Sequence, residues 1–390
     1  MAAARAEAVK FGPMMVDWET RVDFDKMRRE RLERTRASMA KFDVDFLLLI
    51  RMENARYVSG IKRLYWPTLT LAGGPVIMLP REGLMSIGVI DVEMQSQAVS
   101  WIPRDRFREP RRIEVEHEVE AYVDELYEMF GKVIETAKIG VDLWTPAMFK
   151  VLQKRLPKAK FVDGQEVMLD ARIIKTPDEM NLMKLAYSIS EAGMYAAVEA
   201  MKPGVRECEL VGACFNKFWQ LGAETSQCSQ VVNSGPGSFP YRRFHTDRIM
   251  QMGDMVNIDL GACFNGYFGD FCRAFVCGKK PSKKQLDLLK RGHEAQWIGL
   301  NEMRPGVSPA EICKKLGRRA MGHSIGIGPL DPPMLHATWD FIMKPGMAFS
   351  VYTPHMGDAE TGGLHIEDEV FITETGCEVY STYPYTGVDD

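Results

Sequence analysis

The chain has 390 residues, of which 46% are hydrophobic and 26% charged, and its formal net charge is -4. This length and composition predict a globular protein of two domains. The small negative charge gives no electrostatic reason to bind nucleic acid or an anionic membrane. The N-terminal residues do not read as an export signal, and no stretch reaches the roughly 18 apolar residues of a membrane span. With eight cysteines and no CxxC pair, we expect free thiols and a cytoplasmic location.

The first half of the chain alternates between helical and strand-like patterns. Residues 25–42 and 115–130 carry apolar residues at helical spacing and are predicted to be helices. Short apolar runs predict buried strands at 45–50, 75–80, 86–90, 139–142 and 160–163. Together these elements predict an α/β N-terminal domain over residues 1–170.

The second half, residues 171–390, is predicted to place helices on an antiparallel sheet, which is an α+β domain. Thr176 followed by Glu179 has the spacing of a capping box at the start of a helix. The expected elements are helices at 177–201, 207–221 and 283–303, strands near 231 and over 257–275, and mostly strands and turns beyond 320.

Two aspartates, Asp259 and Asp270, lie eleven residues apart on two apolar runs that an Asn-Gly pair joins. Asn-Gly is typical of a tight hairpin turn, which brings side chains on one face of two strands together. Carboxylates placed side by side repel each other unless one takes up a proton or a cation lies between them. The hairpin therefore predicts a metal pair, and a hairpin with two solvated acids is the alternative.

Further motifs follow in order: Gly-His-Ser at His323, Pro-Gly-Met-Ala-Phe before Tyr352, and His-Ile-Glu-Asp at Glu367. Residues 53–60 (ENARYVSG) and 172–179 (RIIKTPDE) precede them. This set resembles the pita-bread family of methionine aminopeptidases, prolidases, aminopeptidase P and creatinase over nearly the whole chain. The resemblance implies a creatinase/prolidase-type N-terminal domain followed by a pita-bread catalytic domain.

In that family two aspartates, a histidine and two glutamates hold two divalent ions. Asp259, Asp270, His323 and Glu367 match four of these ligands, while the remaining glutamate falls on Tyr352. A phenol has a pKa of about 10 and is a poor substitute for a carboxylate. We therefore expect one well-held ion (Mn, Fe, Zn or Co) and a weak or absent second ion at His323. Tyr352 is then either a phenolate ligand or a base, and a metal-free pocket like that of creatinase is the alternative.

The peptidases carry two further histidines that are linked to orienting the substrate, and here Arg242 and Leu330 stand in their expected places. A guanidinium can hold a carboxylate by two parallel hydrogen bonds, although a solvated basic loop is the alternative. The expected substrate-binding residues are Arg242, Arg243, His245 and Trp66, and the expected catalytic residues are Glu367, Tyr352, His323 and Asp270. Three other histidines are expected to be structural hydrogen-bonding groups: His336, His355 and His365.

The resemblance implies a metal-dependent hydrolase of the Xaa-Pro dipeptidase or aminopeptidase type that acts on a small carboxylate-bearing substrate or dipeptide. It also implies a homodimer, in which Trp66 reaches the partner's pocket or packs in the core of its own domain. Two alternatives use the same scaffold: a lyase acting on dimethylsulfoniopropionate and a creatinase-like C–N hydrolase, whose C-terminal tails residues 381–385 resemble. A non-catalytic binding homologue is the third.

Overall fold

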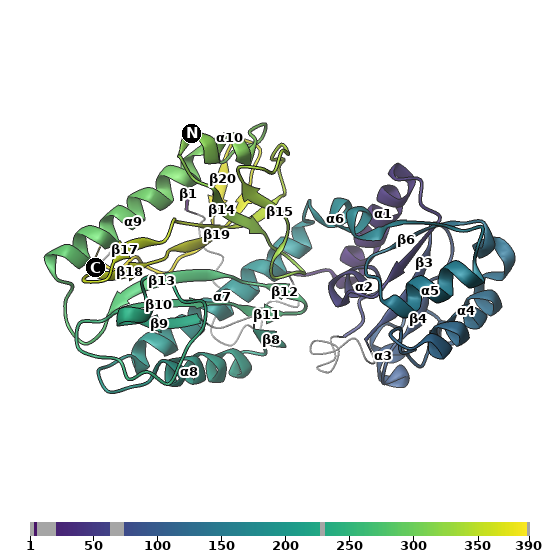
Figure 1. The fold of residues 1–390 in the computed structure, drawn as a ribbon, viewed down its shortest axis with the longest axis horizontal. Helices are drawn as coiled ribbons and strands as arrows, with labels where there is room; N and C mark the ends of the chain where they lie inside the picture. The colour runs from purple at the N-terminus through teal and green to yellow at the C-terminus, as the bar shows by residue number, and fades with distance from the viewer. Residues whose placement is uncertain (1–3, 6–20, 63–73, 227–230, 388–390) are drawn as a thin grey trace. The chain divides into compact units, whose positions relative to one another are not determined.

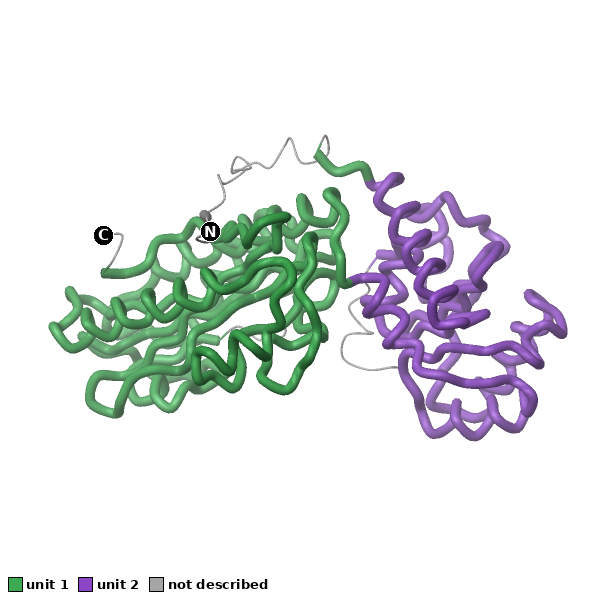
Figure 2. The backbone as a smooth tube through the Cα atoms, turned by 90° about the horizontal axis from the view of Figure 1, so that it is seen from above, with its two compact units in different colours: residues 1–23, 173–390 green, residues 24–172 purple. Residues whose placement is uncertain are grey.

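The computed structural model describes residues 4–5, 21–62, 74–226 and 231–387. The chain forms two compact units, residues 24–172 and residues 1–23 with 173–390 (Figure 2). The expected junction after residue 170 lies two residues from the observed one. The residues before 24 group with the C-terminal unit, where the N–H of Asp23 donates to Asp178 Oδ1 at 2.9 Å.

The N-terminal unit is built on a six-stranded mixed sheet with strand order β5-β4-β3-β2-β6-β7. Figure 1 labels β3, β4 and β6 of this sheet. Its strands are β2 (Phe46–Leu49), β3 (Val76–Pro80), β4 (Ser86–Gly88), β5 (Phe107–Arg108), β6 (Lys138–Val141) and β7 (Lys160–Asp163). Its helices are α1 (Phe24–Lys41), α2 (Met52–Ser59), α3 (Val92–Ala98), α4 (Glu116–Phe130), α5 (Pro146–Arg155) and α6 (Gly164–Arg172). All five predicted strands and both predicted helices of this unit are confirmed.

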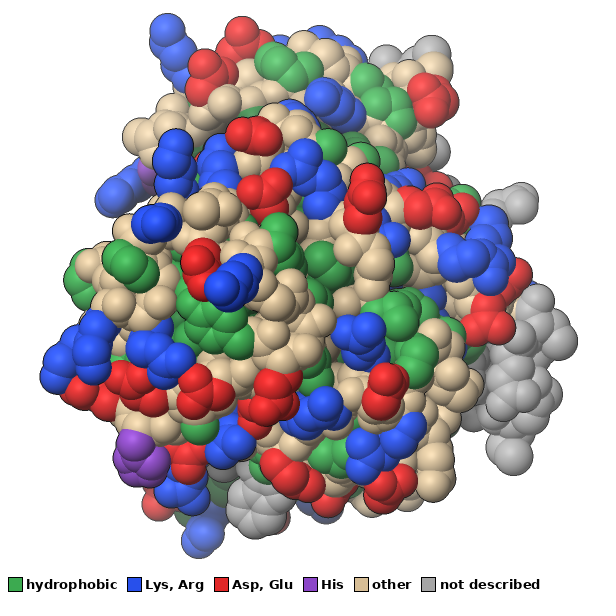
Figure 3. All heavy atoms as spheres, turned by 90° about the vertical axis from the view of Figure 1, so that its right-hand side faces the viewer, with side chains coloured by type: hydrophobic (Ala, Val, Ile, Leu, Met, Phe, Trp, Pro, Cys, Tyr) green, Lys and Arg blue, Asp and Glu red, His purple; other side chains and the backbone are tan. Residues whose placement is uncertain are grey.

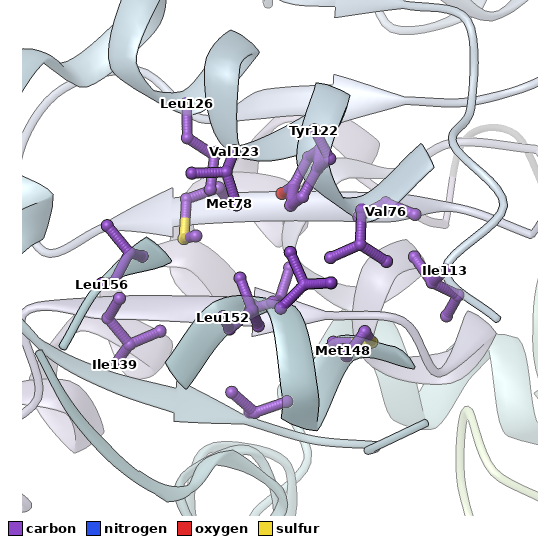
Figure 4. Packing of buried hydrophobic residues seen from close by; sticks show 14 of the residues in the cluster. Val76, Met78, Ile113, Tyr122, Val123, Leu126, Ile139, Met148, Leu152 and Leu156 are labelled. Carbon is purple, nitrogen blue, oxygen red and sulfur yellow. The ribbon is translucent and has the colours of Figure 1, made fainter. Parts of the chain in front are cut away.

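Helices α4 and α5 cover one face of this sheet through a continuous apolar core. Tyr122, Val123 and Leu126 of α4 and Met148 and Leu152 of α5 pack on the strands (Figure 4). The strands carry apolar side chains on both faces, which explains their uninterrupted hydrophobic runs. Outside the core, acidic and basic side chains are mixed over the face that Figure 3 shows, as the near-neutral charge of the chain predicts.

A buried carboxylate holds the start of α2. Asp142, at the end of β6, accepts hydrogen bonds from the backbone N–H of Ile50 at 2.8 Å and of Arg51 at 3.1 Å, and from Asn54 Nδ2 at 2.8 Å. Asn54 is the asparagine of the ENARYVSG segment, so this part of the family motif has a structural explanation. The carboxylate satisfies two backbone donors before the first turn of a helix, where a negative charge is favourable.

The C-terminal unit contains a nine-stranded sheet that includes the path β15-β14-β16-β19-β13-β10-β9, with β20 beside β19 and β1 beside β20. The strands are β1 (Ala4–Arg5), β9 (Val231–Ser234), β10 (Met255–Leu260), β13 (Phe271–Val276), β14 (Ala320–Ser324), β15 (Asp331–His336), β16 (Ala348–Tyr352), β19 (Glu367–Ile372) and β20 (Cys377–Val379). All these pairings are antiparallel except that of β1 with β20. The predicted antiparallel sheet is thus confirmed.

Two smaller sheets and four α-helices complete the described part of this unit. The small sheets are formed by β8 (Thr225–Ser226), β11 (Ala262–Phe264) and β12 (Tyr267–Phe268), and by β17 (Met356–Asp358) and β18 (Gly362–Leu364). The helices are α7 (Pro177–Ala200), α8 (Glu207–Gln220), α9 (Lys283–Glu302) and α10 (Pro309–Lys315). Both reciprocal bonds of the predicted capping box are present: Glu179 N–H donates to Thr176 Oγ1, and Thr176 N–H donates to Glu179 Oε2. Among the described residues, no helix is long and apolar enough to span a membrane.

We expect Asp142→Ala to lower the free energy of unfolding of the N-terminal unit by about 2–4 kcal/mol, because it leaves buried donors without an acceptor. Asp163→Ala is the matched control, since Asp163 accepts the exposed N–H of Gln165 at the start of α6. Its expected cost is about 1 kcal/mol. Urea denaturation of both variants measures the difference, and equal losses would contradict the role assigned to Asp142.

Candidate metal centre

The predicted Asn-Gly turn is confirmed, but it joins the short strands β11 and β12 of a small sheet. Asn265 and Gly266 have φ values of 47° and 88°, the positive values that a tight hairpin turn requires. The longer strands β10 and β13 pair next to this turn, and there Asp259 lies opposite Cys272. Asp259 therefore lies on β10, while Asp270 directly precedes β13, and the two are not cross-strand partners.

The strand register places the candidate ligands on one face of the large sheet. Directly paired residues of antiparallel strands point to the same face. One row across the sheet follows from the pairing: Asp259, Cys272, Glu367 and Tyr352, on β10, β13, β19 and β16. His323 pairs with Ser350, which lies two residues before Tyr352, so it points to this face as well.

The four residues matched to family ligands lie together, and a fifth side chain joins them. Asp270, His323 and Glu367 form one group of ligand atoms, and Asp259, His365 and Glu367 form a second. Within each group the atoms lie within 4.8 Å of one another, and all five side chains are buried. These groups occur in the part of the chain that the structure describes. His365 was expected to be a structural residue rather than a ligand, so its place in the second group was not anticipated from the sequence.

Glu367 lies between the two groups, with one carboxylate oxygen directed to each. Its Oε1 is 3.6 Å from His323 Nε2, and its Oε2 is 3.4 Å from His365 Nε2. The hydroxyl of Ser350 donates to Oε1 at 2.7 Å and fixes the carboxylate. Divergent oxygens of this kind suit a carboxylate that bridges two cations, so the residues present fit a pair of divalent ions.

His323 is oriented as a ligand by its other ring nitrogen. Its Nδ1 lies 3.1 Å from the carbonyl oxygen of Ser324, an acceptor that places the ring proton on Nδ1. Nε2 is then left with its lone pair, at 3.6 Å from Asp270 Oδ2. Metal-binding histidines commonly use such a contact to fix the tautomer.

Ionisation of these buried, neighbouring carboxylates is unfavourable, and a bound cation reduces that cost. Burial raises the pKa of Asp259 to about 6, and the negative charge of Glu367 adds to the effect. Burial acts on Glu367 in the same direction, but contacts with His323 and His365 outweigh it and hold the pKa of Glu367 below its usual value. A divalent ion among these groups favours the ionised form of each carboxylate.

Tyr241, which was not among the expected site residues, is the residue after Pro240 that reaches the centre. Its hydroxyl donates to Asp259 Oδ2 at 2.8 Å, and burial together with the charge of Asp259 raises its pKa, so it keeps its proton. Arg242, which was expected to bind substrate, is engaged in a different contact. It forms an ion pair with the fully buried Glu207, which also accepts from Thr246. A buried carboxylate needs a compensating cation, so the guanidinium of Arg242 is held by Glu207.

The other expected substrate-binding residues differ in their placement. Arg243 is exposed, and its guanidinium lies 5.7 Å from the ring centre of Tyr241. His245 is exposed and belongs to neither group of ligand atoms among the described residues. Trp66 lies outside the described residues.

Aromatic rings surround the second group of ligand atoms. Tyr241 stacks on His355 with ring centres 4.6 Å apart, and both contact His365 at 4.7 Å. Tyr352 lies 5.5 Å from His365 on another side. Burial and the charge of Glu367 raise the pKa of Tyr352, which favours the neutral phenol over a phenolate. Burial lowers the pKa of His355 to about 4, so that ring is neutral near pH 7.

A buried ion pair supports the ligands from the opposite face of the sheet. Arg273 donates to Asp368 Oδ1 at 2.7 Å and to the carbonyl oxygen of Glu367 at 2.9 Å. The ring of Tyr385 lies 4.2 Å from the guanidinium, and its hydroxyl donates to Asp368 Oδ2 at 2.7 Å. The C-terminal residues 381–385 therefore contribute to the packing of the sheet that carries the site.

Comparison with known proteins identifies this arrangement. The family model of the "Creatinase/Prolidase N-terminal domain" matches residues 31–174, and that of "Metallopeptidase family M24" matches residues 181–374. The chain belongs to the pita-bread metallopeptidase family. It is 28% identical to an Xaa-Pro dipeptidase of Pyrococcus furiosus, in an alignment that covers 90% of this chain and 97% of that protein.

Solved pita-bread structures confirm the fold of both units. The prolidase of Pyrococcus horikoshii superposes with a TM-score of 0.76 at 24% identity, covering 92% of this chain and all of the other. The X-Pro aminopeptidase of Thermotoga maritima gives the same TM-score at 21% identity, covering 91% of this chain and 98% of the other. The expected α/β N-terminal domain and α+β pita-bread domain are thus confirmed.

We expect Tyr241→Phe to weaken divalent metal binding about 10- to 100-fold, as loss of a hydrogen bond to a ligand commonly does. The cause is loss of the hydrogen bond that orients Asp259. Titration calorimetry of metal-free protein with MnCl2 measures it, and Tyr195→Phe, at an exposed position on α7, is the control. Unchanged affinity in Tyr241→Phe would show that Asp259 is oriented without this hydrogen bond.

Proposed function

We propose that this protein is a metal-dependent Xaa-Pro peptidase whose divergent centre acts on small substrates with a free carboxylate, dipeptides above all. The observation that carries the proposal is the pair of buried ligand groups that share Glu367. The dipeptidase relative aligns over nearly its whole length, so the site sits in a chain of matching architecture. These relatives favour the peptidase over the lyase and the creatinase-like hydrolase, and the retained ligands argue against a binding homologue.

Asp259, Asp270, His323, His365 and Glu367 would hold a divalent ion, which would supply Lewis acidity and an activated water for hydrolysis. We expect one well-held ion and a weaker second, because Tyr352 replaces the glutamate that the family resemblance implies. Glu367 is proposed to transfer protons during the reaction, since it belongs to both groups of ligand atoms. Tyr352 keeps its proton and is proposed to donate a hydrogen bond to the substrate.

Arg243 is the proposed partner of the substrate carboxylate. Its guanidinium lies 5.7 Å from the ring centre of Tyr241, whose hydroxyl donates to Asp259, and this proximity to the ligand atoms supports the proposal. It is exposed, whereas the neighbouring Arg242 is used by Glu207. A guanidinium matches a carboxylate with two parallel hydrogen bonds.

The rings of Tyr241, His355 and Tyr352 offer an apolar wall for a proline ring next to the ligand atoms. The ring centres of these three residues lie 4.6–5.5 Å from one another or from the ring centre of His365. Their flat faces are therefore close together. Substrate side chains that lack this compact ring are expected to bind less well. The homodimer and the cytoplasmic location stay predictions.

The test is hydrolysis of an Xaa-Pro dipeptide by protein loaded with Mn or Co, compared with the same dipeptide carrying a C-terminal amide. We expect the free acid to be preferred. Arg243→Met should raise KM for the acid about 10- to 100-fold with little change in kcat, because a hydrogen bond to a charged group is worth about 1.5–3 kcal/mol. It should not alter KM for the amide.

Two controls make the result decisive. Arg319→Met removes another exposed arginine and should leave both substrates unaffected, whereas Asp259→Ala should abolish metal binding and activity together. Full activity of Asp259→Ala would contradict the metal mechanism. No dipeptide cleavage, with turnover of a small zwitterionic carboxylate, would replace the peptidase by the lyase or creatinase-like function.

A further inference from the structure

We propose that His365 is a metal ligand, and that it keeps the number of protein donors at five although Tyr352 replaces a glutamate. The ion near Asp259 is then held by Asp259, His365 and the shared Glu367. This inference rests on the proposed metal centre but does not depend on which substrate is cleaved. It changes the chemistry of the centre, because an imidazole takes the place of a carboxylate.

Hydrogen bonds hold the backbone of His365, and neighbouring rings pack against its side chain. Its N–H donates to Asn257 Oδ1 at 3.0 Å, and its carbonyl oxygen accepts from Cys272 Sγ at 3.4 Å. Both partners lie on β10 and β13, the strands that contain Asp259 and directly follow Asp270. The ring is 1% exposed and packs against both Tyr241 and His355. A rigid, buried side chain of this kind suits a ligand that is in place before the ion arrives.

The polar contacts of the ring point to a ligand rather than to a link in a hydrogen-bond chain. Nε2 faces Glu367 Oε2 at 3.4 Å, beyond an ordinary hydrogen bond but close to the spacing of two ligands on one ion. Ligands at about 2.1 Å from a tetrahedral ion lie roughly 3.4 Å apart. Nδ1 has no hydrogen-bond partner in the described part of the chain. A buried imidazole with so few polar contacts is costly unless Nε2 binds something further.

The number of protein donors supports the same conclusion. The family resemblance implies four carboxylates and one imidazole. Asp259, Asp270 and Glu367 with His323 and His365 give three carboxylates and two imidazoles, so five donors are kept and one negative charge is lost. Imidazole suits Zn, Fe and Co, whereas oxygen ligands suit Mn and Mg. The centre should therefore favour Zn, Fe and Co over Mn and Mg more than a site with carboxylate ligands alone would.

The test compares metal affinities of His365→Phe with those of the natural protein, using ZnCl2 and MnCl2 in separate titrations of metal-free protein. Phenylalanine keeps the ring packing and removes the nitrogen. We expect the tightest Zn-binding step to weaken at least about 100-fold, because removing a ligand costs more than removing a partner of a ligand. Mn binding should weaken less. His336→Asn is the control, since His336 contacts Thr338 at an exposed position.

A structural role for His365 predicts something different: equal losses for Zn and Mn, or none. Either result would overturn the proposal. His365→Gln is the second variant if circular dichroism shows that the phenylalanine variant does not fold. Co(II) gives a readout on the natural protein itself: proton NMR at one equivalent should show a strongly shifted, exchangeable imidazole N–H that is absent from both variants. Its absence from the natural protein would also overturn the proposal. Because no substrate enters these measurements, failure to cleave dipeptides leaves their outcome unaffected.

Discussion

Three carboxylates buried within one face of a sheet are the constraint around which the catalytic unit is organised. Asp259, Asp270 and Glu367 are each less than 10% exposed, and they come from three different strands or their ends. Such a cluster is unfavourable without positive charge, because each carboxylate raises the cost of ionising its neighbours. Two imidazoles and the metal ions that they help to bind offset this repulsion, so folding and metal binding are linked.

The remainder of the unit keeps these side chains in position. The register of β10, β13, β19 and β16 sets them in a row, and a one-residue slip in any pair would turn a ligand to the opposite face. On that opposite face Arg273 bonds to Asp368 and to the backbone of Glu367, which locks β13 to β19. A buried ion pair of this kind adds little net stability, but it tolerates few alternative arrangements.

Much of the fold and of the candidate site was predictable from the sequence. The helices and site residues that were not predicted were missed for physical reasons. The capping box at Thr176, the Asn-Gly turn and the long amphipathic helices are local signals, and the structure confirms them. The helices that were missed, α2, α3, α5, α6 and α10, have only seven to ten residues, too few turns for a clear period. Tyr241 was overlooked beside two arginines, although it directly follows Pro240. His365 lies two residues before Glu367, the spacing of one strand face, which was the available signal.

The most direct measurement of the central claim is an anomalous-scattering map from crystals of the protein grown with Zn or Co. The account predicts a strong peak bounded by Asp259, His365 and Glu367, with His365 Nε2 at about 2.0–2.1 Å from the ion. A weaker peak is expected beside Asp270 and His323. A map with a peak only at His323, or with the His365 ring turned away from the ion, would contradict the account.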